Sequence, residues 1–289
     1  MAKGNAVPEF PDSKGERVNG LEDLELELLS EGIYRQYGFD FRQYAHESFR
    51  RRTHNLMELE KVPTVTALLE KILHNQPVME RFLLNMSVSV TSMFRDPQMY
   101  LAFREKIVPI LGTYPSIRVW HAGCATGEEV YSMAMLLQEE SLLEKAKIYA
   151  TDINEVAIKA AKTGIFPLNS MKEYTSNYMR SGGQNSFSQY YSAKYDNAIF
   201  SSRLRSRMVF SKHNLATDSS FNEFNVIFCR NVMIYFNKAL QEHVHELLYK
   251  SLCRFGIIVL GASESLLNSP VAKSYNVLDE ENGIYQRRT

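Results

Sequence analysis

The sequence is poor in the features that mark secreted, metal-binding or membrane-spanning chains. It has only three cysteines, Cys124, Cys229 and Cys253, which are too few and too scattered for a disulfide framework or a zinc site. No run of about eighteen apolar residues is present, and residues 1–20 lack the apolar segment of a signal peptide. We therefore expect a cytoplasmic protein in a reducing compartment, with a flexible tail over residues 1–20 and no bound metal.

The chain also lacks net charge, because 33 Lys and Arg residues balance 33 Asp and Glu residues. This balance argues against broad binding to nucleic acid or to a membrane surface, although a local basic patch can still face one acidic partner. Apolar residues make up 45% of the chain and charged residues 23%, as in folded globular proteins. A chain of 289 residues is long enough for one large domain and a smaller one.

The first third of the chain has the pattern of helices. From residue 21 to about residue 106, apolar residues recur three or four positions apart, and no segment has the pattern of a strand. We expect a helical domain over residues 21–95. Asp96 followed by Pro97 predicts an N-cap and a first-turn proline, and hence a linker helix over residues 96–114.

The rest of the chain, residues 115–289, alternates short β-rich runs with helical segments. This alternation predicts a parallel sheet covered by helices. The runs "YNVLD" and "GIYQR", joined by "EENG", predict an antiparallel pair at the edge of that sheet. The polar segment at about residues 168–206 is interpreted as an inserted subdomain or a mobile flap.

Residues that suit a ligand site follow several of the predicted strands. In "HAGCATGEEVYSMAM", small residues from Gly123 to Gly127 separate a strand from a helix, whose first N–H groups are free to bind a ligand. A short glycine turn of this kind can also be purely structural. Asp152, 25 residues after Gly127, ends the next strand, where a carboxylate can accept hydrogen bonds from both hydroxyls of a ribose. Later strand ends add Asn214, Leu215, Arg230 and Asn231.

Four motifs in the same order give this chain a family resemblance. The segments "VTSMFRDP", "RVWHAGCATGEEVYSMAM", "ATDINEVAIKAAKTGIF" and "FNVIFCRNVMIYF" resemble the CheR-type chemotaxis receptor (protein-glutamate) O-methyltransferases. The resemblance implies the α/β class I methyltransferase fold, Rossmann-like with a seven-stranded mixed sheet. A small all-α N-terminal domain and an inserted subdomain would complete it. The implied cofactor is S-adenosyl-L-methionine, with S-adenosyl-L-homocysteine as product.

The resemblance also implies roles for individual residues. The implied cofactor-binding residues are Thr91, Arg95, Gly123, Glu128, Glu129, Asp152, Asn214, Leu215, Arg230 and Asn231. One of the two glutamates would lie near the methionyl amino group, Asp152 would hold the ribose, and Asn214 with Leu215 would border the adenine. A helix start favours carboxylates, so both glutamates are expected to remain ionised. The residues implied at the reacting groups are Arg95, Arg230 and Tyr235.

A basic stripe is the candidate partner surface. Arg42, His46, Arg50 and His54 recur every four residues, as on one face of a helix, and Arg51 and Arg52 flank them. Such a run can be simply a solvated face. The resemblance implies instead that it docks the acidic, glutamate-bearing cytoplasmic helical domain of methyl-accepting chemotaxis receptors.

Two segments depart from the family pattern. The insertion lacks the pattern that lets some members capture a receptor C-terminal peptide, and Ala262 in "GASESL" stands where a histidine is common. The acceptor is therefore left open between receptor glutamates and another protein or small carboxylate. A non-catalytic signalling module that binds the cofactor is the third alternative, and a monomer is expected.

Overall fold

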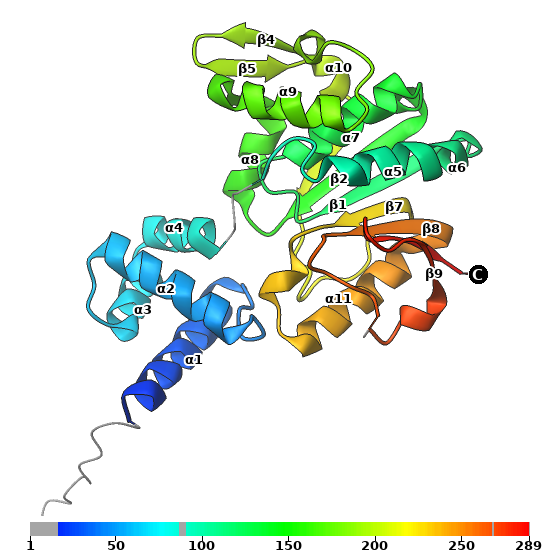
Figure 1. Ribbon diagram of the computed structural model, residues 1–289. Coiled ribbons are helices and arrows are strands. Elements are labelled where there is room, and N and C mark those ends of the chain that lie inside the picture. Colours follow the sequence, from blue (N-terminus) through cyan, green and yellow to red (C-terminus); the bar gives the residue numbers. More distant parts are fainter. Residues whose placement is uncertain (1–16, 87–90, 268, 289) are drawn as a thin grey trace, which may run out of the picture.

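The computed structural model of the chain describes residues 17–86, 91–267 and 269–288. Four helices form the N-terminal part: α1 (Arg17–Tyr37), α2 (His46–Glu60), α3 (Val65–His74) and α4 (Gln76–Met86). Their apolar faces meet in a separate core that includes Leu29, Leu56, Leu68 and Phe82. Figure 1 shows these helices as a group beside the larger part of the molecule. Helix α1 begins inside the predicted tail, and residues 1–16 lie outside the described residues.

The predicted linker helix is wrong in two respects. It is divided into α5 (Pro97–Lys106) and α6 (Val108–Gly112), with Ile107 between them. Asp96 precedes α5 as expected, but it adopts φ 56° and its side chain does not cap the helix. Its carboxylate instead lies 2.5 Å from the buried guanidinium of Arg230, a stronger partner than a backbone N–H.

The prediction of a mixed sheet is confirmed. Seven strands lie in the order β6-β2-β1-β7-β8-β10-β9. Their bounds are β1 (Ile117–Ala122), β2 (Ala146–Asp152), β6 (Met208–Lys212), β7 (Phe224–Cys229), β8 (Leu252–Leu260), β9 (Tyr275–Asp279) and β10 (Ile284–Arg287). The first five strands in this order run parallel, and β10 pairs antiparallel with both β8 and β9. The strands β9 and β10 thus form the expected antiparallel edge.

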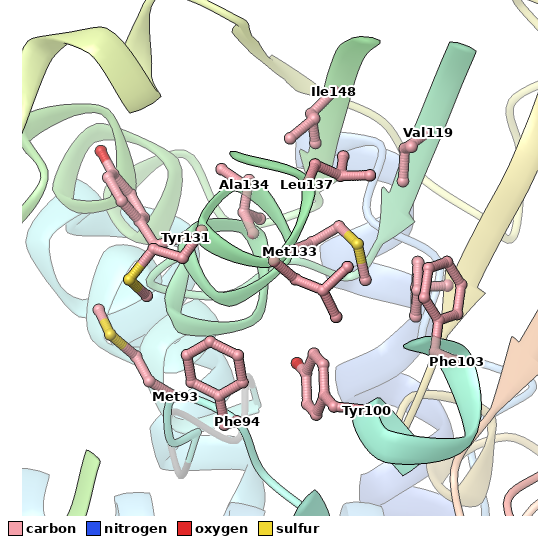
Figure 2. Close-up of a cluster of buried hydrophobic side chains, with 14 of the residues drawn as sticks. Met93, Phe94, Tyr100, Phe103, Val119, Tyr131, Met133, Ala134, Leu137 and Ile148 are labelled. Atoms are coloured by element: carbon pink, nitrogen blue, oxygen red, sulfur yellow. The ribbon is translucent and has the colours of Figure 1, made fainter. Parts of the chain in front are cut away.

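Helices cover both faces of this sheet. Helices α5, α6 and α7 (Glu128–Glu139) lie on one side, α11 (Lys238–Ser251) lies on the other, and α8 (Glu155–Thr163) follows β2 (Figure 1). Alternate residues of β1 enter different cores, since Val119 packs with α7 and Trp120 packs with α11. Figure 2 shows Met133 and Leu137 of α7 facing Val119 and the neighbouring strand. The all-round burial of α7 fixes the position of its first turn at the sheet edge.

The insertion is a folded subdomain in the structure. It contains β3 (Ile165–Pro167), α9 (Met171–Arg180), β4 (Tyr191–Lys194), β5 (Asn197–Phe200) and α10 (Ser202–Arg205), with the antiparallel order β3-β5-β4. Glu139, at the end of α7, accepts hydrogen bonds from the hydroxyls of Tyr178 and Tyr190 in this subdomain. These buried contacts join the insertion to the main sheet's helix layer. Across the described ranges, no helix is both long enough and apolar enough to cross a membrane.

Candidate cofactor site at the carboxyl edge of the sheet

Two adjoining pockets lie where β1, β2 and β7 end. The first, here called the apolar pocket, is lined by Phe41, Tyr44, Leu83, Met86, Gly123, Ala125, Asp152, Ile153, His213, Asn214, Leu215, Asn231, Val232, Tyr235 and Phe236. The second, here called the polar pocket, is lined by Thr91, Ser92, Arg95, Gly123, Cys124, Ala125, Glu129, Arg230, Asn231 and Tyr235. Gly123, Ala125, Asn231 and Tyr235 line both, so one elongated ligand can occupy the two pockets together.

The loop after β1 forms the floor between the pockets. Gly123 has φ 79°, a left-handed conformation that favours glycine, and a Cβ built there would lie 2.5 Å from Val232. Ala125 also has a positive φ, of 47°. This tight turn brings the backbone of the β1–α7 loop against the pocket and leaves no room for a side chain at Gly123.

Asp152 is held at the tip of β2 by backbone donors. Its Oδ2 accepts a hydrogen bond from Ala125 N at 2.9 Å, and its Oδ1 accepts one from Asn154 N at 2.8 Å. Burial raises the pKa of Asp152, while these N–H groups act in the opposite direction. The carboxylate is therefore fixed in orientation while still lining the apolar pocket.

The two adjacent glutamates of α7 face different surroundings. Glu129 lines the polar pocket, and its carboxylate lies 2.9 Å from His121 Nδ1 and 2.8 Å from Arg230 Nη1. Burial acts to raise the pKa of Glu129, but the His121 hydrogen bond and the charge of Arg230 outweigh it and lower the pKa to about 2. The structure thus brings Glu129, and not Glu128, into the pocket.

Glu128 lies outside both pockets. It is buried, accepts a hydrogen bond from Thr126 Oγ1 at 2.7 Å, and lies 3.5 Å from the hydroxyl of Tyr174 in the insertion. Burial raises the pKa of Glu128. The sequence left open which of the two glutamates faces the cofactor, and the structure separates them because consecutive helix positions point in directions about 100° apart.

Arg230 forms ion pairs with two carboxylates of the chain, which the sequence did not predict. Its guanidinium is buried and pairs with Glu129 at 2.8 Å and with Asp96 at 2.5 Å. Burial acts to lower the pKa of Arg230, yet the charge of Glu129 more than compensates, so the pKa is raised. Arg230 lines the polar pocket as expected, but its fork is directed to two carboxylates of the chain itself.

The segment after β7 joins the two pockets and contacts the N-terminal helices. Asn231 has φ 60°, and both it and Tyr235 line the two pockets. Arg52 lies over the Tyr235 ring, 4.4 Å from its centre, and Ala45 N donates a hydrogen bond of 2.8 Å to Tyr235 O. Part of the predicted docking surface is therefore in direct contact with the site.

Most members of the predicted basic stripe have acidic partners within the chain, so the stripe is less electropositive than the sequence alone suggests. Arg42 precedes α2 and pairs with Asp40 and Glu31. His46 pairs with Asp23, and both Arg50 and His54 pair with Glu22. The acidic partners of the three α2 residues lie on α1, which packs beside α2, a contact that spacing along the sequence does not reveal.

Two members of the predicted surface differ from the rest. Arg52 is buried, 6% exposed, and donates hydrogen bonds to the carbonyls of Asn85 and Met86, so it is not a surface residue. Arg51 is exposed, and the structure shows no acidic partner for it within the described ranges. Among the residues that the structure describes, Arg51 is thus the one exposed cation of the predicted surface without an acidic partner.

Several lining residues were missed by the sequence interpretation. Phe41 and Tyr44, between α1 and α2, and Leu83 and Met86 of α4 cover the apolar pocket, and no local motif signals this long-range contact. His213, next to Asn214, was recognisable as part of the strand end "KHNL". Ala262 is exposed and lines neither pocket. Among the described residues, no group of three or more His, Cys, Asp or Glu is placed to hold a metal ion.

Comparison with known proteins connects this geometry to a family. Residues 89–280 match the family model described as "CheR methyltransferase, SAM binding domain", and residues 24–87 match "CheR methyltransferase, all-alpha domain". The chain is 46% identical to a Pseudomonas putida protein named "Putative methyltransferase Cher3", over 92% of this chain and 97% of that protein. It is 27% identical to the chemotaxis protein methyltransferase of Listeria monocytogenes, over 86% of this chain and 93% of that protein.

A solved structure is similar only distantly. A SAM-dependent methyltransferase from Geobacter sulfurreducens in complex with S-adenosyl-L-homocysteine aligns with 14% identity and a TM-score of 0.33. The alignment covers 60% of this chain and 51% of that chain. At this level of similarity it adds nothing to the family assignment.

Proposed function

Because the chain belongs to the CheR methyltransferase family, we propose that it transfers a methyl group from S-adenosyl-L-methionine to glutamate side chains of methyl-accepting chemotaxis receptors, forming methyl esters. The observation that supports the site most strongly is the placement of two carboxylates in adjoining pockets, Asp152 in the apolar one and Glu129 in the polar one. An adenosyl sulfonium carries a diol on its ribose and an ammonium group at its methionyl end. One carboxylate in each of two adjoining pockets suits that molecule.

The residues present fit the cofactor in three further ways. Apolar side chains from the N-terminal part, Phe41, Leu83 and Met86, provide a wall for a flat base. Asn214 and Leu215 line the same pocket. The close turn at Gly123 lets the ligand approach the backbone. When bound, the cofactor supplies an electrophilic methyl group on a positively charged sulfur.

The acceptor needs no general base in this reaction. A glutamate side chain with a pKa of about 4.3 is already ionised at neutral pH and is the nucleophile. The chain's contribution is to align the carboxylate with the methyl group and to exclude water, and alignment alone is worth about 7–11 kcal/mol in well-oriented systems. We assign the orienting role to Arg95 and Tyr235, which line the polar pocket.

Arg230 has a supporting role in this proposal. Since its guanidinium already pairs with Glu129 and Asp96, it does not clamp the acceptor, and a clamp would stabilise the ground state of the nucleophile. Arg230 instead keeps Glu129 ionised and in place for the amino group of the cofactor. We place the receptor's helical cytoplasmic domain against α2, with Arg51 as the cation that meets its acidic face, and we expect a monomeric enzyme.

Methyl transfer can be tested directly. Purified protein and labelled S-adenosyl-L-methionine are incubated with membranes that carry chemoreceptors, and base-labile label on the receptor is measured. We expect label in the wild type, a large loss in Tyr235→Phe at saturating substrate, and a loss in Arg51→Glu that is absent from the exposed control Arg254→Glu. An unchanged rate in Tyr235→Phe would remove the tyrosine from the mechanism.

A second acceptor is favoured by one observation. The acids of α1 neutralise most of the basic stripe, which weakens the electrostatic case for an acidic receptor bundle. The second candidate function is methylation of another protein or of a small carboxylate at the same site. Base-labile label that appears on other proteins of a cell extract, but not on receptors, would support this candidate over the first.

A further inference from the structure

Glu264 forms an unusual cluster of hydrogen bonds behind the site. Its Oε1 accepts hydrogen bonds from Val232 N at 2.8 Å and Met233 N at 2.7 Å. Its Oε2 accepts hydrogen bonds from Asn231 N and Gly261 N, each at 2.8 Å. One side chain thus satisfies three consecutive N–H groups after β7 and a fourth at the end of β8.

The backbone around this carboxylate has the form of an anion-binding nest. Successive N–H groups point into one concavity when a residue in the left-handed region interrupts the chain, as Asn231 does with φ 60°. Here the anion belongs to the chain itself. Gly261 leaves room for it, since a Cβ at that position would lie 2.7 Å from Glu264 Oε2 and 2.8 Å from Asn231 N.

The segment whose N–H groups bind Glu264, residues 231–233, lies where the two pockets meet. Asn231 and Tyr235 line both, and Val232 packs over the turn at Gly123. On its other side, Gln241 Nε2 donates hydrogen bonds to the carbonyls of Met233 and Phe236, each at 3.0 Å. These side-chain partners hold the segment in addition to the short 3-10 helix over Met233–Tyr235.

We propose that Glu264 is a positioning residue of the cofactor site, which acts through the backbone of residues 231–233 to set the places of Asn231 and Tyr235. Glu264 lines neither pocket, so it touches neither cofactor nor acceptor. The proposal rests on the cofactor site described above and adds to it a residue outside that site.

Removing the charge changes the nest in a specific way. Glutamine has the size of glutamate, but its amide nitrogen is a donor and cannot accept from the N–H groups on that side. At least one pair of backbone donors then loses its acceptor, and the left-handed turn at Asn231 loses its support. The cofactor should bind more weakly, while turnover at saturating cofactor and acceptor changes less.

The test measures the affinity for S-adenosyl-L-homocysteine by calorimetry, well below the melting temperature. We expect binding about tenfold weaker in Glu264→Gln, in line with the loss of charge-assisted hydrogen bonds. The exposed Glu281→Gln serves as the charge-matched control, and the core variant Ile258→Val serves as a destabilised control on β8, the strand that precedes Glu264. Both controls should bind as the wild type does.

A second variant keeps the test open if Glu264→Gln fails to fold. Gly261→Ala retains the carboxylate but pushes a methyl group against Oε2, so it should weaken binding in the same way, and the double variant should show no additive loss. Unchanged affinity in the folded variants, with only a lower melting temperature, would overturn the proposal. A wild type that does not bind the nucleoside would instead defeat the cofactor site itself.

Discussion

The guanidinium of Arg52 lies 4.4 Å from the centre of the Tyr235 ring, which joins the second helix of the N-terminal part to the segment after β7. Arg52 is buried, and its neighbour Arg51 is exposed on the same helix. A partner that binds Arg51 on the outer face of α2 would therefore contact the residue next to Arg52, which itself contacts the site. This connection gives the N-terminal helices a direct structural role at the pocket as well as a docking role.

Replacing Arg52 should affect the site more than replacing Arg51. A desolvated cation–π contact is worth about 2 kcal/mol, and Arg52→Ala also leaves the carbonyls of Asn85 and Met86 without their donor. We expect kcat/KM to fall about tenfold. Arg51→Ala is the control, and it should leave the affinity for S-adenosyl-L-homocysteine unchanged. Equal effects of the two variants on this affinity would show that the ring contact does not matter.

The two glutamates of α7 should respond differently to loss of charge. Glu129→Gln removes the partner of His121 and Arg230 and the anion of the polar pocket, so cofactor binding should weaken at least tenfold, or about 1.4 kcal/mol. Glu128→Gln is the matched control from the same turn, outside the pocket, and should bind nearly normally. Calorimetry with S-adenosyl-L-homocysteine measures both, and a stronger effect at Glu128 would reverse the assignment.

The turn at Gly123 should not tolerate a side chain. Gly123→Ala places a methyl group 2.5 Å from Val232 at a φ of 79°, which should cost about 1–2 kcal/mol of stability and weaken cofactor binding. Gly112→Ala is the control, because a Cβ there meets nothing within 4 Å. Thermal unfolding compares the two variants, and similar melting temperatures would show that the β1–α7 turn adapts easily.

Stability should decrease in mild acid because of His245. Burial lowers the pKa of this imidazole to about 4, whereas in the unfolded chain it takes up a proton near pH 6.5. Between these values the unfolded state binds more protons, so the free energy of unfolding should fall by up to about 1.4 kcal/mol per pH unit as the pH decreases. The stability gained from the neutral ring is fully present only above about pH 6.5.

The variant His245→Gln isolates this contribution. Urea unfolding of wild type and variant between about pH 4.5 and pH 7 should give a flatter pH profile for the variant. Glu129, whose pKa is lowered to about 2, loses its contribution mainly below this window. Parallel profiles for the two proteins would contradict the assignment to His245.

The sequence allowed the main sheet and one edge of the site to be predicted. Strand patterns fixed β1, β2 and β7, and because parallel strands end at one edge, Asp152 and Arg230 were expected together there. The sequence did not show which way each side chain of the first turn of α7 points. Glu128 and Glu129 were therefore equal candidates for the cofactor contact, and only the structure shows that Glu129 lines the polar pocket.

Contacts between distant segments were the part that could not be predicted. Glu22 and Asp23 of α1 lie more than twenty residues from their basic partners in α2, and the covering residues Phe41 and Met86 belong to a separate helical core. The role of Glu264 could not be predicted for another reason. Its partners are backbone N–H groups, which every residue except proline has, so the pattern of residue types does not indicate them.

The most direct test of the account is the affinity of the purified protein for S-adenosyl-L-homocysteine in wild type and in Asp152→Asn. The account predicts one site per chain in the wild type and binding at least about tenfold weaker in the variant, because Asp152 lines the apolar pocket with a carboxylate that backbone donors hold in place. No binding by the wild type, or equal binding by the folded variant, would contradict it.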